Sequence, residues 1–304
     1  MSKSKKIKSA SPKVRKFARE LGANINEVSG TQRSGRVTEE DVKNFVKSQV
    51  SVNQGKIEKK IDIVEYPHEA FGLVEIKELP RVKKLSGPQL VKSWTEIPHV
   101  TQHDEIDITE MEQFRTSLID NYTGEKIKIS PLAFVTRAVV NALKRYPNFN
   151  ASLDNQNNKI IFKKYFHIGF AVDTPHGLMV PKIRNVDQLS LREIYEELKR
   201  VSKLCRDLKI EKKEFFGGSM TISSLGGIGG NFFTPIINPP EVSILGVGKT
   251  FEKIKRIDGK LIIRKILPIS LSYDHRLIDG AEGARFCVHL GESLGKDFAF
   301  KLAV

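Results

Sequence analysis

From about residue 77 to residue 294 the sequence alternates between helix-like and strand-like segments, and this alternation restricts the fold more than any other feature. Helical spacing or capping marks five segments, at residues 85–94, 109 onward, 131–146, 191–208 and 280–294. Runs typical of strands lie between them, at residues 99–108, 165–172, 178–183, 219–223, 242–248 and 267–273. Asp258-Gly259 predicts a hairpin turn. Because no dinucleotide-binding opening is present, the pattern indicates an α/β sandwich, a sheet covered by helices.

Residues 10–48 have a different pattern, which is typical of a very small helical domain. A first helix is expected over residues 12–21, where apolar side chains recur at spacings of three and four. A capping pattern at Thr38 predicts a second helix, and a loop with two glycines, residues 30–36, separates the two. Residues 49–76 lack sustained periodicity and are expected to form a linker, so the larger domain is expected to span residues 77–304.

The charge is uneven along the chain. The net charge is +14, and residues 1–50 carry +7 of it. A basic segment of this kind binds an acidic partner, and charge alone leaves open whether that is nucleic acid or an acidic protein surface. No apolar run approaches the roughly 18 residues of a membrane span, and no apolar stretch follows the basic N-terminus as in a secretory signal. The simplest expectation is a protein of a bacterial cytoplasm, with a mitochondrial matrix protein as the less favoured alternative.

Metal and redox chemistry find little support in the sequence. Cys205 and Cys287 stand far apart and outside any CxxC pair, so both are expected to be buried in helices. His99 and His103 share one face of a predicted strand and are followed by Asp104, but they lack a clear third ligand. We therefore expect no metal.

The densest group of reactive side chains lies in residues 274–280, Asp-His-Arg-Leu-Ile-Asp-Gly, between a predicted strand and a predicted helix. At such a turn His275 can point its ring into a cleft while neighbouring groups fix its tautomer. Asp279 is expected to pair with an arginine and stiffen the turn, and Gly280 to let the helix begin close against it. A histidine at a turn is also often structural, and the residues alone leave both interpretations open.

A second candidate segment is glycine-rich and lies earlier in the chain, at residues 217–230, where it includes the strand predicted at residues 219–223. The segment lacks the Lys-Ser/Thr pair of a phosphate loop, and no helix opens after it, which argues against phosphate binding. Ser223 or Ser224, at the strand end, could instead donate a hydrogen bond to an oxyanion. The alternative is an ordinary surface hydroxyl.

Taken together, these segments resemble the dihydrolipoamide acyltransferases, the core components of 2-oxoacid dehydrogenase complexes. Residues 274–280 are similar to the family's DHRxxDG signature. Further similar segments follow the family's order, at residues 97–101 (IPHVT), 173–178 (DTPHGL), 221–226 (TISSLG) and 235–241 (PIINPPE). Residues 14–19 and 30–37 resemble the family's peripheral subunit-binding domain. The resemblance covers nearly the whole chain except the linker.

The resemblance implies a two-layer sandwich like that of chloramphenicol acetyltransferase, with a mixed sheet, working as a trimer within a larger core. It implies active sites between subunits, entered by coenzyme A and by dihydrolipoamide. By position in the motifs, His275 corresponds to the base and Ser223 to the hydroxyl donor from the neighbouring subunit. Asp279 corresponds to a residue that holds the site by an ion pair, and Ser224 is the less favoured donor.

The resemblance also indicates the acyl group and the partners. Residues 221–226 and Ser93-Trp94 resemble the acetyl-transferring branch, with succinyl or branched-chain acyl groups as alternatives. A non-catalytic dehydrogenase-binding component is a further alternative, although such relatives commonly lose His275 and Asp279, which are present here. Lipoate is expected on a lipoyl domain, whose Asp-Lys-Ala turn the sequence lacks. Either the chain is a fragment of a longer protein, or the lipoyl domain is on another polypeptide. The small domain, through Arg15, Arg19 and Arg36, is expected to dock pyruvate dehydrogenase (the decarboxylase) or dihydrolipoamide dehydrogenase, and not nucleic acid.

Overall fold

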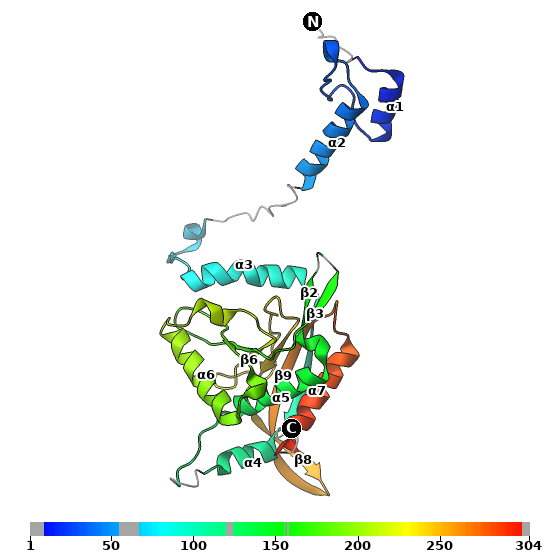
Figure 1. Ribbon diagram of the computed structural model, residues 1–304. Helices are drawn as coiled ribbons and strands as arrows, with labels where there is room; N and C mark the ends of the chain where they lie inside the picture. The colour runs from blue at the N-terminus through cyan, green and yellow to red at the C-terminus, as the bar shows by residue number, and fades with distance from the viewer. Residues whose placement is uncertain (1–8, 55–66, 120–123, 155, 157, 300–304) are drawn as a thin grey trace. The chain divides into compact units, whose positions relative to one another are not determined.

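The structure, a computed structural model, describes residues 9–54, 67–119, 124–154, 156 and 158–299. It divides into two compact units, residues 1–76 and 77–304. The smaller unit contains α1 (Pro12–Glu20), a short 3₁₀ helix (Arg33–Gly35) and α2 (Glu39–Gln54), and a further 3₁₀ turn spans His68–Phe71 (Figure 1). The two helices were expected, but α2 continues into the segment expected to be a linker. Residues 55–66 of that linker lie outside the described residues.

Local sequence explains how the smaller unit begins. The hydroxyl of Ser11 accepts a hydrogen bond from the Val14 amide, and Pro12 occupies the first turn of α1, where no amide donor is needed. The buried core is formed by small apolar side chains, which are Val14, Ala18, Val28, Val37 and Val42. So small a core leaves this unit dependent on its polar contacts.

The larger unit contains the remaining elements (Figure 1). Its helices are α3 (Arg81–Glu96), α4 (Thr109–Ser117), α5 (Pro131–Arg145), α6 (Leu191–Arg206) and α7 (Gly280–Leu294). Its strands are β1 (His99–Asp107), β2 (Ala151–Asp154), β3 (Lys159–Phe162), β4 (Ile168–Phe170), β5 (Lys182–Ile183), β6 (Met220–Ser224), β7 (Ser243–Val247), β8 (Phe251–Ile257) and β9 (Lys260–Asp274). Short 3₁₀ helices span Pro147–Asn150, Val186–Gln188 and Lys212–Phe215.

The main sheet is mixed. Its strands follow the order β1-β9-β7-β6-β4-β5, and β8 pairs with β9 beyond the end of β7. β6 runs parallel to both β4 and β7, while the other pairs are antiparallel. The expected fold class, an α/β sandwich with a mixed sheet and a small helical unit, is confirmed.

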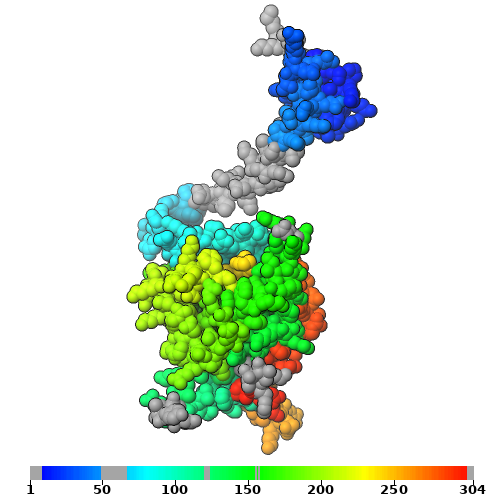
Figure 2. Space-filling model, in the orientation of Figure 1, coloured from blue at the N-terminus to red at the C-terminus, as the bar shows by residue number. Residues whose placement is uncertain are grey.

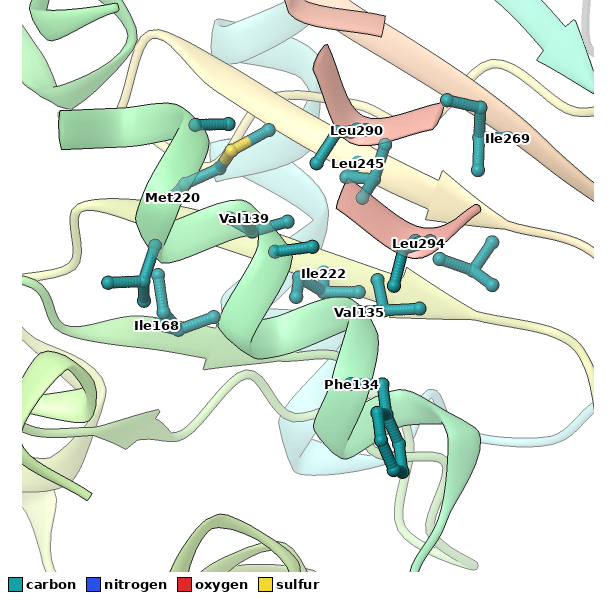
Figure 3. Close-up of a cluster of buried hydrophobic side chains, with 14 of the residues drawn as sticks. Phe134, Val135, Val139, Ile168, Met220, Ile222, Leu245, Ile269, Leu290 and Leu294 are labelled. Carbon is teal, nitrogen blue, oxygen red and sulfur yellow. The ribbon is translucent and has the colours of Figure 1, made fainter. Parts of the chain in front are cut away.

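A single apolar core joins the helices to this sheet. Val135 and Val139 of α5 point toward the sheet, and Leu290 and Leu294 of α7 lie beside them (Figure 3). The facing strand residues, Met220, Ile222, Leu245 and Ile269, are at most 1% exposed. Burying one such side chain contributes about 1.5–3 kcal/mol, so this core fixes β6 and β9 firmly. Those two strands lead to Ser223 and His275.

The hairpin predicted from the sequence is present, while some strands differ from the prediction. Asp258 and Gly259 have φ angles of 48° and 78° and turn β8 into β9, as predicted. The tip of this hairpin protrudes from the unit (Figure 2). The β2–β3 hairpin was not expected, and β4 and β5 are shorter than the strands predicted there. None of the helices in the described ranges has the length and hydrophobicity needed to cross a membrane.

Candidate active site

The turn that carries His275 is held rigidly from behind. Asp274 is 2% exposed, and its carboxylate accepts hydrogen bonds from Arg276 Nε at 2.9 Å and Nη2 at 2.6 Å. The His275 amide donates to the Pro98 carbonyl at 3.1 Å. The His275 side chain itself is exposed, and the described residues of the single chain offer its imidazole no hydrogen bond. The backbone is therefore fixed while the ring faces outward.

Within the single chain, Asp279 forms a helix cap and not the ion pair expected from the sequence. The arginine of the turn, Arg276, pairs with Asp274, and no ion pair of Asp279 exists among the described residues. Its carboxylate instead accepts the Glu282 amide at 2.7 Å and caps the N-terminus of α7. Gly280 is not the residue at which α7 comes closest to the preceding strand, because a Cβ there would lie 3.9 Å from the Tyr273 hydroxyl. That residue is Gly283, where an added Cβ would lie 2.8 Å from the Tyr273 ring.

Ser223 lies in a pocket. It is half-buried near the end of β6, and it lines a cavity of about 360 Å³ together with Thr221, two residues earlier on the same face of the strand. The other walls come from α3, from residues 235–239 and from four apolar side chains, Ala171, Leu178, Val180 and Ile244. Ser224 points to the other face of β6 and does not line this cavity. The geometry thus separates the two candidate serines in favour of Ser223.

A buried ion pair supports the floor of this pocket. Lys182 and Glu241 have side chains that are 1% exposed, and the Lys182 ammonium binds the Glu241 carboxylate. Thr221 Oγ1 accepts from Lys182 Nζ at 3.0 Å and donates to Glu241 Oε2 at 2.6 Å. Gly218 makes room, because a Cβ there would lie 2.2 Å from Glu241 Oε1. Nearby, burial lowers the pKa of Lys163 to about 8, and Lys182 acts in the same direction. Sequence reasoning missed this cluster.

One chain cannot bring Ser223 and His275 together. Ser223 pairs with Gly246 of β7, which pairs with Ser270 of β9, five residues before His275. With about 3.3 Å per residue along a strand and about 4.8 Å between strands, the two side chains start roughly 15–20 Å apart. A hydrogen bond needs about 3 Å. A site that uses both residues must therefore be completed by a second copy of the chain.

The other histidine candidates are bound elsewhere. His99 Nδ1 lies 2.8 Å from the Ile97 carbonyl, and its Nε2 accepts the Ile237 amide at 3.1 Å. His103 Nδ1 lies 2.9 Å from Ser270 Oγ. Within the described ranges no cluster of three or more His, Cys, Asp or Glu side chains is placed to hold a metal.

Both cysteines are buried in helices, as expected. Burial raises the pKa of Cys205, in α6, to about 11 and that of Cys287, in α7, to about 12. Both thiols are therefore protonated at neutral pH and pack as small apolar groups.

The basic residues of the smaller unit lie on its surface elements. Arg15 and Arg19 are on α1, where Arg19 Nε donates to the Arg15 carbonyl at 3.3 Å. Arg36 is exposed just after the 3₁₀ helix. Asp41, which belongs to the predicted capping pattern at Thr38, also organises this loop: its carboxylate accepts the Thr31 and Thr38 amides at 3.1 and 2.9 Å and the Thr31 hydroxyl at 2.8 Å. The contacts with Thr31 were not expected from the sequence.

This network makes the smaller unit sensitive to acid. The Thr38 amide, aided by Thr31, lowers the pKa of Asp41 from 3.8 to about 2. A depressed folded-state pKa stabilises the fold above the unfolded value, so this stabilisation is lost as the pH falls from about 4 to 2. We expect protection of α1 and α2 amides from hydrogen exchange, corrected for intrinsic rates, to decrease over that range. Asp41→Asn should make this decrease with pH smaller, whereas the control Glu40→Gln should leave it unchanged. If the two variants show the same dependence of protection on pH, the acid sensitivity does not come from Asp41.

Comparison with known proteins places this architecture in a family. Residues 73–299 match the model of the 2-oxoacid dehydrogenases acyltransferase (catalytic domain), which is most of the chain. The chain belongs to the 2-oxoacid dehydrogenase acyltransferase family. Residues 9–43 additionally match the e3 binding domain.

Curated and solved members of the acyltransferase family are close in sequence. The dihydrolipoyllysine-residue acetyltransferase components of the pyruvate dehydrogenase complexes of Cupriavidus necator and Haemophilus influenzae are 48% and 42% identical, each over 94% of this chain. This chain spans 53% of the length of each. The solved dihydrolipoamide acetyltransferase of Azotobacter vinelandii is 43% identical, with a TM-score of 0.75 over 79% of this chain and 98% of its own. The cubic core of a pyruvate dehydrogenase multienzyme complex matches with the same values.

Proposed function

We propose that this chain transfers an acetyl group between S-acetyldihydrolipoamide and coenzyme A and forms part of the core of a pyruvate dehydrogenase complex. One observation carries the proposal. Work on the Azotobacter vinelandii acetyltransferase concerns the catalytic role of a serine, a histidine 52 residues later and an asparagine four residues after that. Ser223 and His275 have the same separation, and Asp279 stands in the place of the asparagine.

The chemistry follows from the properties of thiols. A thiol with a pKa of about 8.5 is mostly protonated at neutral pH, and the thiolate is the nucleophile. His275 removes the proton from the attacking thiol, and the sulfur bonds to the thioester carbonyl carbon. The carbonyl oxygen becomes an oxyanion, which accepts a hydrogen bond from Ser223. The original carbon–sulfur bond then breaks, and His275 returns its proton to the leaving thiolate.

The site is completed between copies of the chain. His275 faces outward from one chain, and Ser223 of another approaches it, because the two residues of a single chain start too far apart. A ring of three copies in head-to-tail contact gives three equivalent sites. The cubic core formed by a similar protein supports assembly of such trimers into a larger shell.

The proposed substrates are coenzyme A and dihydrolipoamide, with lipoate carried on a lipoyl domain. Acetyl is favoured over succinyl and branched-chain acyl groups because the curated relatives compared above are acetyltransferases. Because these relatives are bacterial, a bacterial cytoplasm is the proposed location. The test is to incubate the chain with free dihydrolipoamide and either acetyl- or succinyl-coenzyme A and to follow the thioester absorbance. Faster turnover of succinyl-coenzyme A, or no turnover of either, would contradict the proposal.

The smaller unit is proposed to dock the decarboxylase or dihydrolipoamide dehydrogenase of the complex. We expect Arg36→Ala to weaken this docking by about tenfold or more, because charged anchors with a matched partner dominate such interfaces. Acyl transfer by the larger unit should not change. Titration calorimetry with each enzyme measures the docking, and Lys47→Ala, on α2, is a control. Unaltered affinity for both enzymes would rule out Arg36 as a contact.

A further inference from the structure

The peptide of Ile237 is held on both sides by residues from a distant part of the chain. Its amide donates to His99 Nε2 at 3.1 Å, and its carbonyl accepts a 2.6 Å hydrogen bond from the buried Ser93 hydroxyl. The His99 tautomer is fixed, since Nδ1 lies 2.8 Å from the Ile97 carbonyl and must carry the proton there. Ile97, Ile237 and Ile244 form a separate buried cluster around this point.

Within one chain, the hydrogen bonds of Ser93 and His99 to the Ile237 peptide lie between the two segments that the proposed chemistry uses, each of which serves a different site of the assembly. On one side, residues 235–239 form a wall of the cavity that contains Ser223, and Ser93 lines the same cavity. On the other side, Pro98, immediately before His99, accepts the His275 amide through its carbonyl. In the space-filling view α3, which carries Ser93, packs along one end of the larger unit (Figure 2). Ser93 and His99 thus connect the wall of the Ser223 pocket to the turn that carries His275.

We propose that Ser93 and His99 are positioning residues, which hold residues 235–239 against the Ser223 pocket and in register with the His275 turn. This inference rests on the proposed acyl transfer. Neither residue exchanges a proton with substrate: both His99 nitrogens and the Ser93 hydroxyl are already used by the backbone. Their effect acts through placement, and a displacement of about 1 Å in a reacting group can cost about 10² in rate.

Two substitutions at His99 distinguish hydrogen bonding from packing. His99→Phe keeps a ring beside Trp94, whose ring centroid lies 5.3 Å away, but removes both nitrogens. His99→Gln removes the ring but keeps an acceptor for the Ile237 amide. We expect His99→Phe and Ser93→Ala each to lower kcat/KM by about tenfold or more, mostly in kcat, and His99→Gln to remain within about threefold of wild type. His103→Phe, on the same strand, is the matched control and should stay within about twofold.

The outcomes separate this inference from the proposed function. A wild-type chain without acetyl transfer overturns the function and the inference with it. If the wild type is active and both His99→Phe and Ser93→Ala are fully active, the inference alone is overturned. The inference is also overturned if His99→Phe is more active than His99→Gln, because ring packing without the hydrogen bonds would then be sufficient. Emission from Trp94, the single tryptophan of the chain, reports thermal unfolding of each variant. If His99→Phe unfolds, Ser93→Ala provides the decisive comparison.

Discussion

Replacing His275 with alanine is expected to lower the rate of acetyl transfer to dihydrolipoamide by about 10²- to 10⁴-fold, the contribution typical of a general base. The fold should not suffer, because the side chain is exposed and the turn is held by the His275 amide and by the Asp274–Arg276 pair, which alanine retains. Steady-state kinetics give the rate, and sedimentation compares the assembly with wild type. Full activity in the variant would refute the assignment of His275 as the base.

The pH dependence of this variant tests the reason for the loss. If His275 acts by deprotonating a thiol, a higher pH replaces its action. Between pH 7 and pH 9 the thiolate fraction of a thiol with a pKa of about 8.5 rises from a few per cent to about three quarters. We expect His275→Ala to regain activity over this range. A flat profile would mean that His275 contributes something other than proton transfer.

The parts of the fold that the sequence predicts well are those set by local patterns. α7 begins and ends at the predicted residues, because Asp279 caps it and apolar side chains recur at helical spacing through Leu290 and Leu294. The turn at Asp258-Gly259 was recognisable because few other pairs adopt two successive positive φ angles. The β2–β3 hairpin had no such signal, since β3 is exposed at every position and lacks alternation.

The parts that could not be predicted depend on contacts between distant residues. Lys182 and Glu241 are 59 positions apart, and Ser93 and Ile237 are 144 apart. Nothing in their local sequences distinguishes them from surface residues. Asp279 is a local case: the sequence suggested an ion pair with an arginine, whereas in the single chain its carboxylate caps α7 and Arg276 pairs with Asp274. The motif resemblance identified His275 and Ser223 as candidates from neighbouring subunits, and the sheet register supplies the physical reason, since it holds the two residues of one chain apart.

Replacing Ser223 with alanine is expected to lower kcat by about 10²- to 10³-fold with a smaller effect on KM, since the hydroxyl acts on the oxyanion formed during the reaction. Ser224→Ala is the matched control, because that side chain points away from the pocket. Unlike His275→Ala, this variant should not recover at high pH, since ionising the thiol does not replace a lost donor. A large loss in Ser224→Ala with none in Ser223→Ala would reverse the assignment.

The two inactive variants together test the most demanding part of the proposal. We assume that each site takes His275 from one chain and Ser223 from the next. A Ser223→Ala chain still supplies His275, and a His275→Ala chain still supplies Ser223, so a mixed trimer contains some intact sites where the two meet. Random assembly of equal amounts restores about a quarter of the sites in a head-to-tail ring. Co-refolding or co-expression of the two variants should therefore recover about a quarter of wild-type activity, while simple mixing of preformed trimers should not. A single-chain site predicts no recovery in either case, because every chain then lacks one of the two groups.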